Sequence, residues 1–129
     1  MYFFEKMKSV PGSLRIWFIV HFLVDLVFAL PLIFVPGWLL SLFGFSVGEL
    51  VTPRLVGAAF LAIGGTSFLI RNKSVESFET LLTLKIIWSV VAILGIILAL
   101  LEGTSPFAWG VLGTYVLFFC VWVWYKRKN

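Results

Sequence analysis

The chain has 129 residues, of which 61% are hydrophobic and 12% are charged, and its net charge is +4. Soluble domains contain roughly half hydrophobic and about a quarter charged residues, so a water-soluble domain of this length could not bury so much apolar surface. The composition therefore excludes an ordinary soluble domain and indicates an integral membrane protein. The basic residues lie at the ends of the apolar stretches, which indicates membrane topology and argues against nucleic-acid binding.

The first apolar stretch runs from about 14 to 34. It reaches the ~20 residues that a helix needs to cross the ~30 Å hydrocarbon core of a bilayer. Pro31 and Pro36 are expected to end or kink this helix, because proline lacks the N–H that continues it. The segment of about 37–44 is too short to span, so we expect a short interfacial helix or a tight loop on the membrane surface.

Three further stretches are each near the length of a membrane span, and they run from about 53 to 70, 78 to 101 and 106 to 125. Hydroxyl residues at helix-capping positions precede them: Thr52 and Ser105 each stand before a proline, and Ser74 precedes the third stretch. We therefore predict an all-α fold, a bundle of four transmembrane helices in a single domain of residues 1–129.

Basic residues predict the orientation of this bundle. An even number of spans brings three groups of Lys and Arg to one side, which the positive-inside rule makes the cytoplasmic side. The groups are Lys6, Lys8 and Arg15 before the first span, Arg71 and Lys73 between the second and third, and Lys126, Arg127 and Lys128 after the fourth. We therefore expect a multi-pass protein of a bacterial inner membrane with both termini in the cytoplasm.

Small residues recur at helical spacing on two of the spans. The hydrophobic effect does not drive helices together within lipid. Close packing of small residues therefore contributes more to the association of membrane helices than it does in water. The candidates are Gly57, Ala58, Ala62 and Gly65 on the second span and Gly110 and Thr114 on the fourth. These residues are expected either to pack the bundle internally or to form the seam of a homo-oligomer.

Ionisable residues inside the spans are the candidate functional residues, because each charged one costs ~2.5–3.5 kcal/mol to insert at a helix centre. His21 and Asp25 are four residues apart and share a helix face, and Lys85 lies on the third span. Thr66 and Ser89 are expected at a similar depth. The cluster has three interpretations: it binds a small solute or relays protons, it is a structural Asp25–Lys85 pair, or Lys85 reaches the inner interface and contributes nothing.

A second charged set is expected at the outer surface. Arg54 lies in the first turn of the second span, where the helix dipole disfavours a cation. A carboxylate partner is therefore predicted, and Glu49 and Glu102 are the candidates. The set is interpreted as a salt bridge that tethers the loops, with a ligand site as the alternative.

The second span carries a resemblance to a known family. Its opening, Arg54-Leu55-Val56-Gly57-Ala58-Ala59-Phe60-Leu61-Ala62-Ile63-Gly64, resembles the DoxX-like group of small bacterial four-helix membrane proteins. The resemblance implies the four-span layout and assigns Arg54 and Gly57 to helix-start and packing positions. Some members of that group are linked to quinol oxidase or thiol-redox systems, and the single cysteine here, Cys120, departs from a dithiol pattern.

Catalytic and metal-binding motifs are absent from the sequence, and no cofactor is indicated. We therefore expect no enzymatic activity. The leading hypothesis is a partner or assembly subunit that acts within the lipid bilayer, with a homo-oligomer or another membrane protein as its partner. The rival hypothesis is a small proton or solute transporter or channel that uses His21, Asp25 and Lys85.

Overall fold

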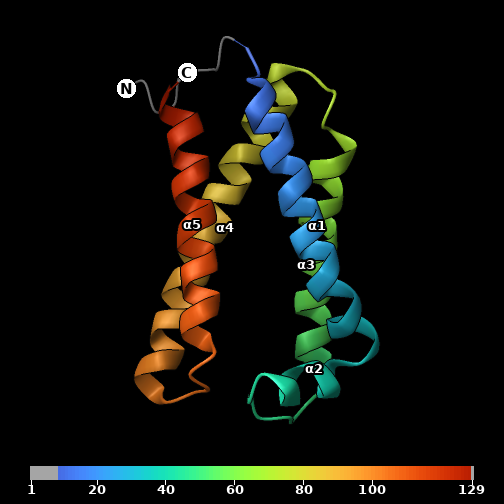
Figure 1. The fold of residues 1–129 in the computed structure, drawn as a ribbon, viewed down its shortest axis with the longest axis vertical. Helices are drawn as coiled ribbons and strands as arrows, with labels where there is room; N and C mark the ends of the chain where they lie inside the picture. The colour runs from blue at the N-terminus through green and yellow to red at the C-terminus, as the bar shows by residue number, and fades with distance from the viewer. Residues whose placement is uncertain (1–8, 129) are drawn as a thin grey trace. The chain divides into compact units, whose positions relative to one another are not determined.

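All regular secondary structure that the computed structural model describes, over residues 9–128, is α-helical (Figure 1). Two of the basic residues used above, Lys6 and Lys8, lie outside that range. The helices are α1 (Gly12–Phe34), α2 (Pro36–Leu42), α3 (Val51–Leu69), α4 (Val75–Glu102) and α5 (Ala108–Lys128). Within the described residues, α1, α3, α4 and α5 are long and apolar enough to cross a membrane. The prediction of an all-helical chain with four candidate spans is confirmed to that extent.

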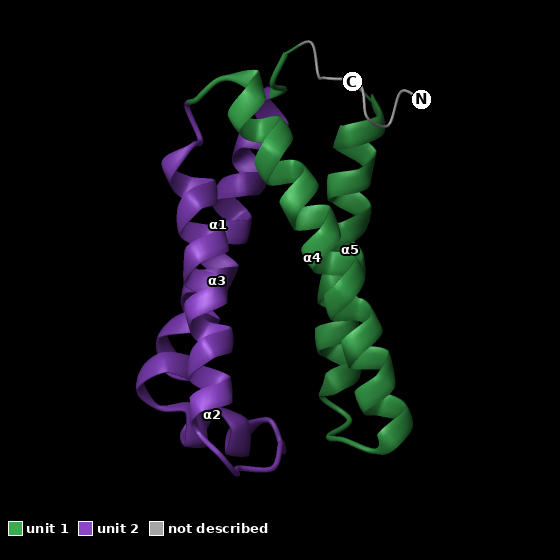
Figure 2. Cartoon of the chain, turned by 180° about the vertical axis from the view of Figure 1, so that it is seen from behind, with its two compact units in different colours: residues 1–11, 73–129 green, residues 12–72 purple. Residues whose placement is uncertain are grey.

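Two compact units make up the chain, and Figure 2 colours them separately. Residues 12–72 form one unit, which contains α1, α2 and α3 and is called the α1–α3 unit below. The other unit contains α4 and α5 and is called the α4–α5 unit. Each unit has its own internal packing.

The α1–α3 unit is built on two antiparallel helices that lie side by side (Figures 1 and 2). Near the start of α3, Gly57 faces Leu32 close to the end of α1. Further along α3, the ring of Phe68 stacks on Phe22, with ring centroids 4.7 Å apart. Since higher residue numbers on α3 meet lower numbers on α1, the two helices run in opposite directions.

Helix α1 continues through Pro31 and ends at Phe34. The N–H of Val35 donates to the carbonyl of Pro31 at 2.8 Å, which closes the last turn. Pro36 then opens α2, where its fixed φ suits the first helical position and its missing N–H costs nothing. The chain forms a helix of 7 residues where a short helix or a loop was expected. Its end lies near α1, with the rings of Phe28 and Phe43 6.4 Å apart.

The α4–α5 unit pairs the 28-residue helix α4 with the 21-residue helix α5. Lys126 near the end of α5 meets Glu79 near the start of α4, so these helices are also antiparallel. Gly103 ends α4 with φ = 97°, a conformation that a residue with a Cβ rarely adopts. This glycine allows the chain to turn into α5.

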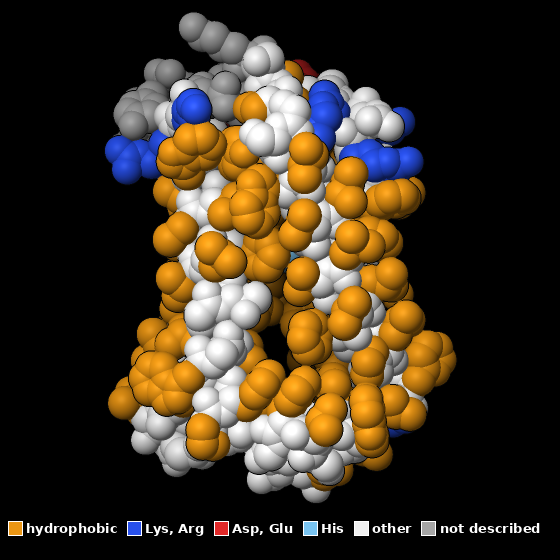
Figure 3. Space-filling view, in the orientation of Figure 1, with side chains coloured by type: hydrophobic (Ala, Val, Ile, Leu, Met, Phe, Trp, Pro, Cys, Tyr) orange, Lys and Arg blue, Asp and Glu red, His pale blue; other side chains and the backbone are white. Residues whose placement is uncertain are grey.

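Hydrophobic side chains cover the flanks of both units, as the space-filling view shows (Figure 3). Leu and Val residues on the long helices are exposed to a degree that water would penalise: Val27 is 65% exposed, Leu69 70% and Leu101 79%. Lipid tails remove this cost, because they are as apolar as the side chains themselves. The exposed faces therefore agree with the assignment of these helices as membrane spans.

Candidate functional site

His21 and Asp25 form a buried polar pair on α1. The His21 Nε2 atom lies 3.4 Å from Asp25 Oδ2, and the two residues are only 7% and 8% exposed. Asp25 is the fourteenth residue of the 23-residue helix, so it lies about 20 Å along a helix of about 34 Å at 1.5 Å per residue. The pair thus places a carboxylate and an imidazole near the middle of a candidate span, where an ionisable group is costly and is usually functional or paired.

Helix α3 approaches this pair through a glycine. A Cβ built on Gly64 would lie 2.8 Å from the Cβ of Asp25 and 3.0 Å from its Oδ2 atom. Any side chain at position 64 would therefore push Asp25 or separate the helices. Gly64 lies seven residues after Gly57 and therefore on the same face of α3. Its contact with Asp25 could not be predicted from the sequence, because spacing within one helix does not give the register between two helices.

Thr66, predicted to join the polar cluster, lies on an exposed face of α3 and donates to the carbonyl of Ala62 at 2.7 Å. The next residue, Ser67, is fully buried and donates to the carbonyl of Ile63 at 2.8 Å. Neighbouring residues on a helix point about 100° apart. The buried hydroxyl on this part of α3 is therefore Ser67.

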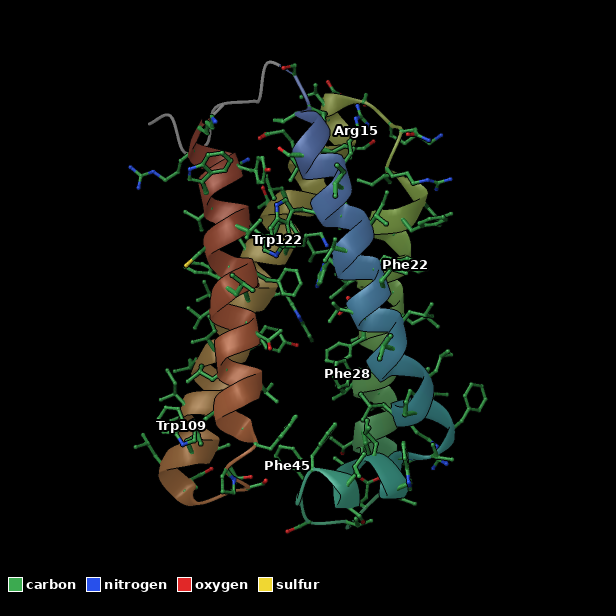
Figure 4. All side chains as sticks on the ribbon, viewed as in Figure 1. Arg15, Phe22, Phe28, Phe45, Trp109 and Trp122 are labelled. Atoms are coloured by element: carbon green, nitrogen blue, oxygen red, sulfur yellow. The ribbon has the colours of Figure 1, made fainter. Side chains whose placement is uncertain are left out.

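Lys85 and Ser89 lie on α4 and are 0% and 2% exposed. The Lys85 Nζ atom lies over the indole ring of Trp122, 4.7 Å from the ring centroid. Trp122, labelled on α5 in Figure 4, stacks in turn on Phe118 at 5.6 Å. A cation over an aromatic face is stabilised by about 0.5–2 kcal/mol, more as water is excluded. Because Asp25 and Lys85 belong to different units, their pairing stays a prediction.

The α4–α5 unit contains a buried ion pair that the sequence analysis did not predict. Lys126 Nζ donates to both carboxylate oxygens of Glu79, at 2.7 and 3.1 Å. The residues are 6% and 8% exposed. From the sequence, Lys126 was interpreted as one of the basic residues that orient the bundle. The spacing of 47 residues between the partners leaves no local signal for this contact.

The outer charged set has partners other than the expected ones. Arg54 Nε donates to the backbone carbonyl of Ile33 at 2.9 Å, at the C-terminal end of α1. The helix dipole is negative at that end, which accounts for a cation at the start of α3. Glu49 accepts hydrogen bonds from the first residues of α3, and Glu102 is an exposed residue at the end of α4 in the other unit. Arg54 thus binds the C-terminal end of α1, and Glu49 binds the N-terminal end of α3.

Glu49 supplies the acceptor that was expected from Thr52, because α3 begins one residue before Thr52. Its carboxylate accepts from the N–H of Val51 and, at 3.2 and 2.7 Å, from the N–H and hydroxyl of Thr52. The Thr52 hydroxyl first, and then these two backbone N–H groups, hold the pKa of Glu49 below its ordinary value of 4.5. Charged Glu49 is therefore the form that stabilises the start of α3.

The predicted packing residues divide into two groups. Gly57 faces α1, where an added Cβ would lie 2.9 Å from Ile33 and 3.0 Å from Leu32. A Cβ on Gly65 or Gly110 would meet no atom within 4 Å. The remaining predicted residues are exposed, and they are Ala58, Ala62 and Thr114. Within the α1–α3 unit, the helix interface therefore uses the stripe that contains Gly57 and Gly64.

No cluster of three or more potential metal ligands occurs among residues 9–128. Comparisons with protein-family models, with curated proteins and with solved structures find no match to this chain. Function is therefore inferred from the buried polar groups and from the exposed faces of the helices. His21 and Asp25 can bind or exchange a proton, Lys85 provides a buried cation beside an indole, and the exposed small-residue faces can receive another helix.

Proposed function

We propose that this chain is a small multi-pass protein of a bacterial inner membrane that acts as a non-enzymatic partner or assembly subunit, and that it belongs to the DoxX-like group. The observation that supports this role is the unused small-residue face of α3. Ala58, Ala62 and Thr66 are exposed on that face, and no atom lies within 4 Å of a Cβ built on Gly65.

Small residues at a membrane helix surface let a second helix approach until the two backbones pack closely. On α3 these four residues fall within about 100° of one another around the helix axis, so they form one continuous strip. Thr66 also satisfies its hydroxyl on its own helix, with a 2.7 Å bond to Ala62, so the strip can be buried without leaving a polar group unpaired. The strip suits a partner helix, from a second copy of the chain or from another membrane protein.

The distribution of charge supports termini in the cytoplasm. In the α1–α3 unit, Arg15 and Arg71 lie at the same end, because α1 begins where α3 ends. In the α4–α5 unit, three basic residues fill the last turn of α5, beside the start of α4. The positive-inside rule assigns such ends to the cytoplasmic face.

Ala62→Leu tests the partner role, because it adds bulk in the middle of the small-residue strip. Its matched control is Val56→Phe, which adds bulk on a different, 37%-exposed side of α3. Tagged protein is purified from mildly solubilised native membranes, and its mass and bound proteins are measured. We expect a complex with wild type and with Val56→Phe, and its loss with Ala62→Leu. A strictly monomeric wild-type protein without a bound partner would contradict the proposal.

The second candidate function, a proton or solute transporter or channel, is favoured by the 3.4 Å pair of His21 and Asp25 near the middle of α1. Buried ionisable groups at this depth are typical of proton relays. Protein reconstituted in liposomes with an internal pH dye measures the flux. Transport predicts a proton or solute flux that Asp25→Asn abolishes. An absent flux, or one that Asp25→Asn leaves unchanged, excludes this function.

A further inference from the structure

The charged end of the α1–α3 unit holds an arginine whose side chain is fixed in place. The guanidinium carbon of Arg71 lies over the ring of Phe68, 3.9 Å from the centroid, and its Nη1 donates to the Phe68 carbonyl at 2.8 Å. Phe68 is itself stacked on Phe22 of α1. One face of the guanidinium is therefore covered, and rotation of the side chain is restricted.

A second arginine, Arg15, contacts the same end of α3. Its Nη1 donates to the backbone carbonyl of Arg71, just past the end of α3 (Figure 4 labels Arg15 at the start of α1). Both arginines are partly buried. Both guanidinium groups thus donate to backbone carbonyls at the C-terminal end of α3, where the helix dipole is negative.

The Arg71 side chain keeps hydrogen-bonding capacity. Guanidinium has five N–H donors, and within residues 9–128 Arg71 spends one of them, on Phe68. The Nε–H and Nη2–H groups form the planar fork that binds two oxygens of a phosphate at once. The acidic residues of the α1–α3 unit are Asp25 and Glu49. Asp25 lies near the middle of α1 and Glu49 precedes the opposite end of α3, so this fork has no carboxylate of its own unit beside it.

The fork also lies at the depth of lipid headgroups. Helix α3 has 19 residues, so it spans about 28 Å at 1.5 Å per residue, close to the ~30 Å hydrocarbon thickness. Arg71 follows the last residue of α3 by two positions. If the apolar helix fills the hydrocarbon layer, Arg71 falls within the layer of phosphates.

We propose that Arg71, stacked on Phe68 and supported by Arg15, is a binding site for the phosphate of an anionic phospholipid. The covered face and the Phe68 bond orient the guanidinium, and the open edge receives the phosphate oxygens. Arg15 adds positive charge, which favours a headgroup with net negative charge over a zwitterionic one. The site does not depend on the protein's binding partner or on transport.

Native mass spectrometry of the full-length protein in detergent measures the binding, with phosphatidylglycerol, phosphatidylcholine and inorganic phosphate as separate probes. We expect phosphatidylglycerol to bind more tightly than phosphatidylcholine, and inorganic phosphate to bind far more weakly than either. Arg71→Gln should weaken phosphatidylglycerol binding roughly tenfold, because a charge-assisted bidentate contact is lost. Arg127→Gln removes the same charge from an exposed residue of α5, outside the stack of Arg71 on Phe68, and should change binding by less than about twofold.

Arg71→Lys keeps the charge but not the fork, so it should weaken binding roughly threefold. Phe68→Leu should have an effect of similar size, because it removes the ring that orients the guanidinium. Helix content by circular dichroism confirms that each variant is folded, and if Arg71→Gln is not, the lysine variant decides. Equal effects of the Arg71 and Arg127 variants would show diffuse attraction and overturn the proposal. Equal affinity for inorganic phosphate would overturn the lipid as its ligand.

Discussion

Gly64 and Gly65 are neighbours on α3 with opposite surroundings. A Cβ at position 64 would collide with Asp25 at 2.8 Å, whereas a Cβ at position 65 would meet nothing within 4 Å. Gly64→Ala should therefore lower the stability of the α1–α3 packing by about 1–3 kcal/mol, the usual cost of overpacking. Gly65→Ala should be neutral or slightly stabilising, because alanine favours the helix. Unfolding midpoints of the detergent-solubilised variants measure both effects. A pair of equal midpoints would show that α3 does not approach Asp25 through Gly64.

A second prediction at the scale of single residues concerns the contribution of the buried Glu79–Lys126 ion pair to stability. Lys126→Met leaves the Glu79 carboxylate buried without its 2.7 Å partner, which should cost roughly 3–5 kcal/mol. The double variant with Glu79→Gln should recover most of that loss, since it removes the uncompensated charge. Lys128→Met, at an exposed position in the same turn, is the control and should cost at most about 1 kcal/mol, the usual value of an exposed cation–π contact such as the one Lys128 makes with Trp124. Thermal unfolding of the wild type, the two single variants, the double variant and the Lys128→Met control tests the coupling, and simple additivity of the Lys126→Met and Glu79→Gln effects would contradict it.

Near the connection between α1 and α3, two charged residues stabilise the ends of helices. Arg54 on α3 reaches the last turn of α1, and Glu49 satisfies N–H groups at the start of α3. Both contacts match the sign of the helix dipole that they face. From the sequence, Arg54 and Glu49 were interpreted as members of a salt bridge. In the structure, each instead makes a separate interaction with the end of a helix.

The Glu49 interaction predicts a pH dependence. Because the folded state lowers the Glu49 pKa, the carboxylate stabilises the start of α3 above its unfolded value of 4.5, and the effect is lost as pH falls through the lower folded value. Amide exchange at Val51 and Thr52, corrected for intrinsic rates, should show protection that decreases between about pH 5 and about pH 3. Glu49→Gln should remove this pH dependence. Protection that is constant over that range in wild type would contradict the assignment.

Patterns within one helix could be predicted from the sequence, and contacts between helices could not. Composition and span length predicted four long apolar helices, and the spacing of four residues put His21 and Asp25 on one face. The contact of Arg54 with Ile33 and the contact of Glu79 with Lys126 depend on register, the alignment of one helix against another. Close packing at small residues such as Gly57 and Gly64 determines the register. Several sets of small residues in the sequence could have formed that contact, so the sequence does not show which set is used.

At the scale of the whole molecule, the proposed topology has four helices that cross the membrane in alternating directions. The exposed apolar residues and the basic residues at the ends of α1, α3 and α5 support this topology. Two short connections, residues 70–74 and 103–107, should then lie on opposite sides of the membrane, because α4 alone separates them.

Labelling of single cysteines with a membrane-impermeant maleimide tests this topology most directly. Cys120 is first replaced by serine, so that one introduced cysteine at a time can react. Ser46→Cys and Thr104→Cys should be labelled in intact spheroplasts, because their loops face outward. Ser9→Cys, Asn72→Cys and Lys128→Cys should be labelled only after lysis. Labelling of Asn72→Cys and Thr104→Cys from the same side would contradict a membrane-spanning α4, and with it the four-span account.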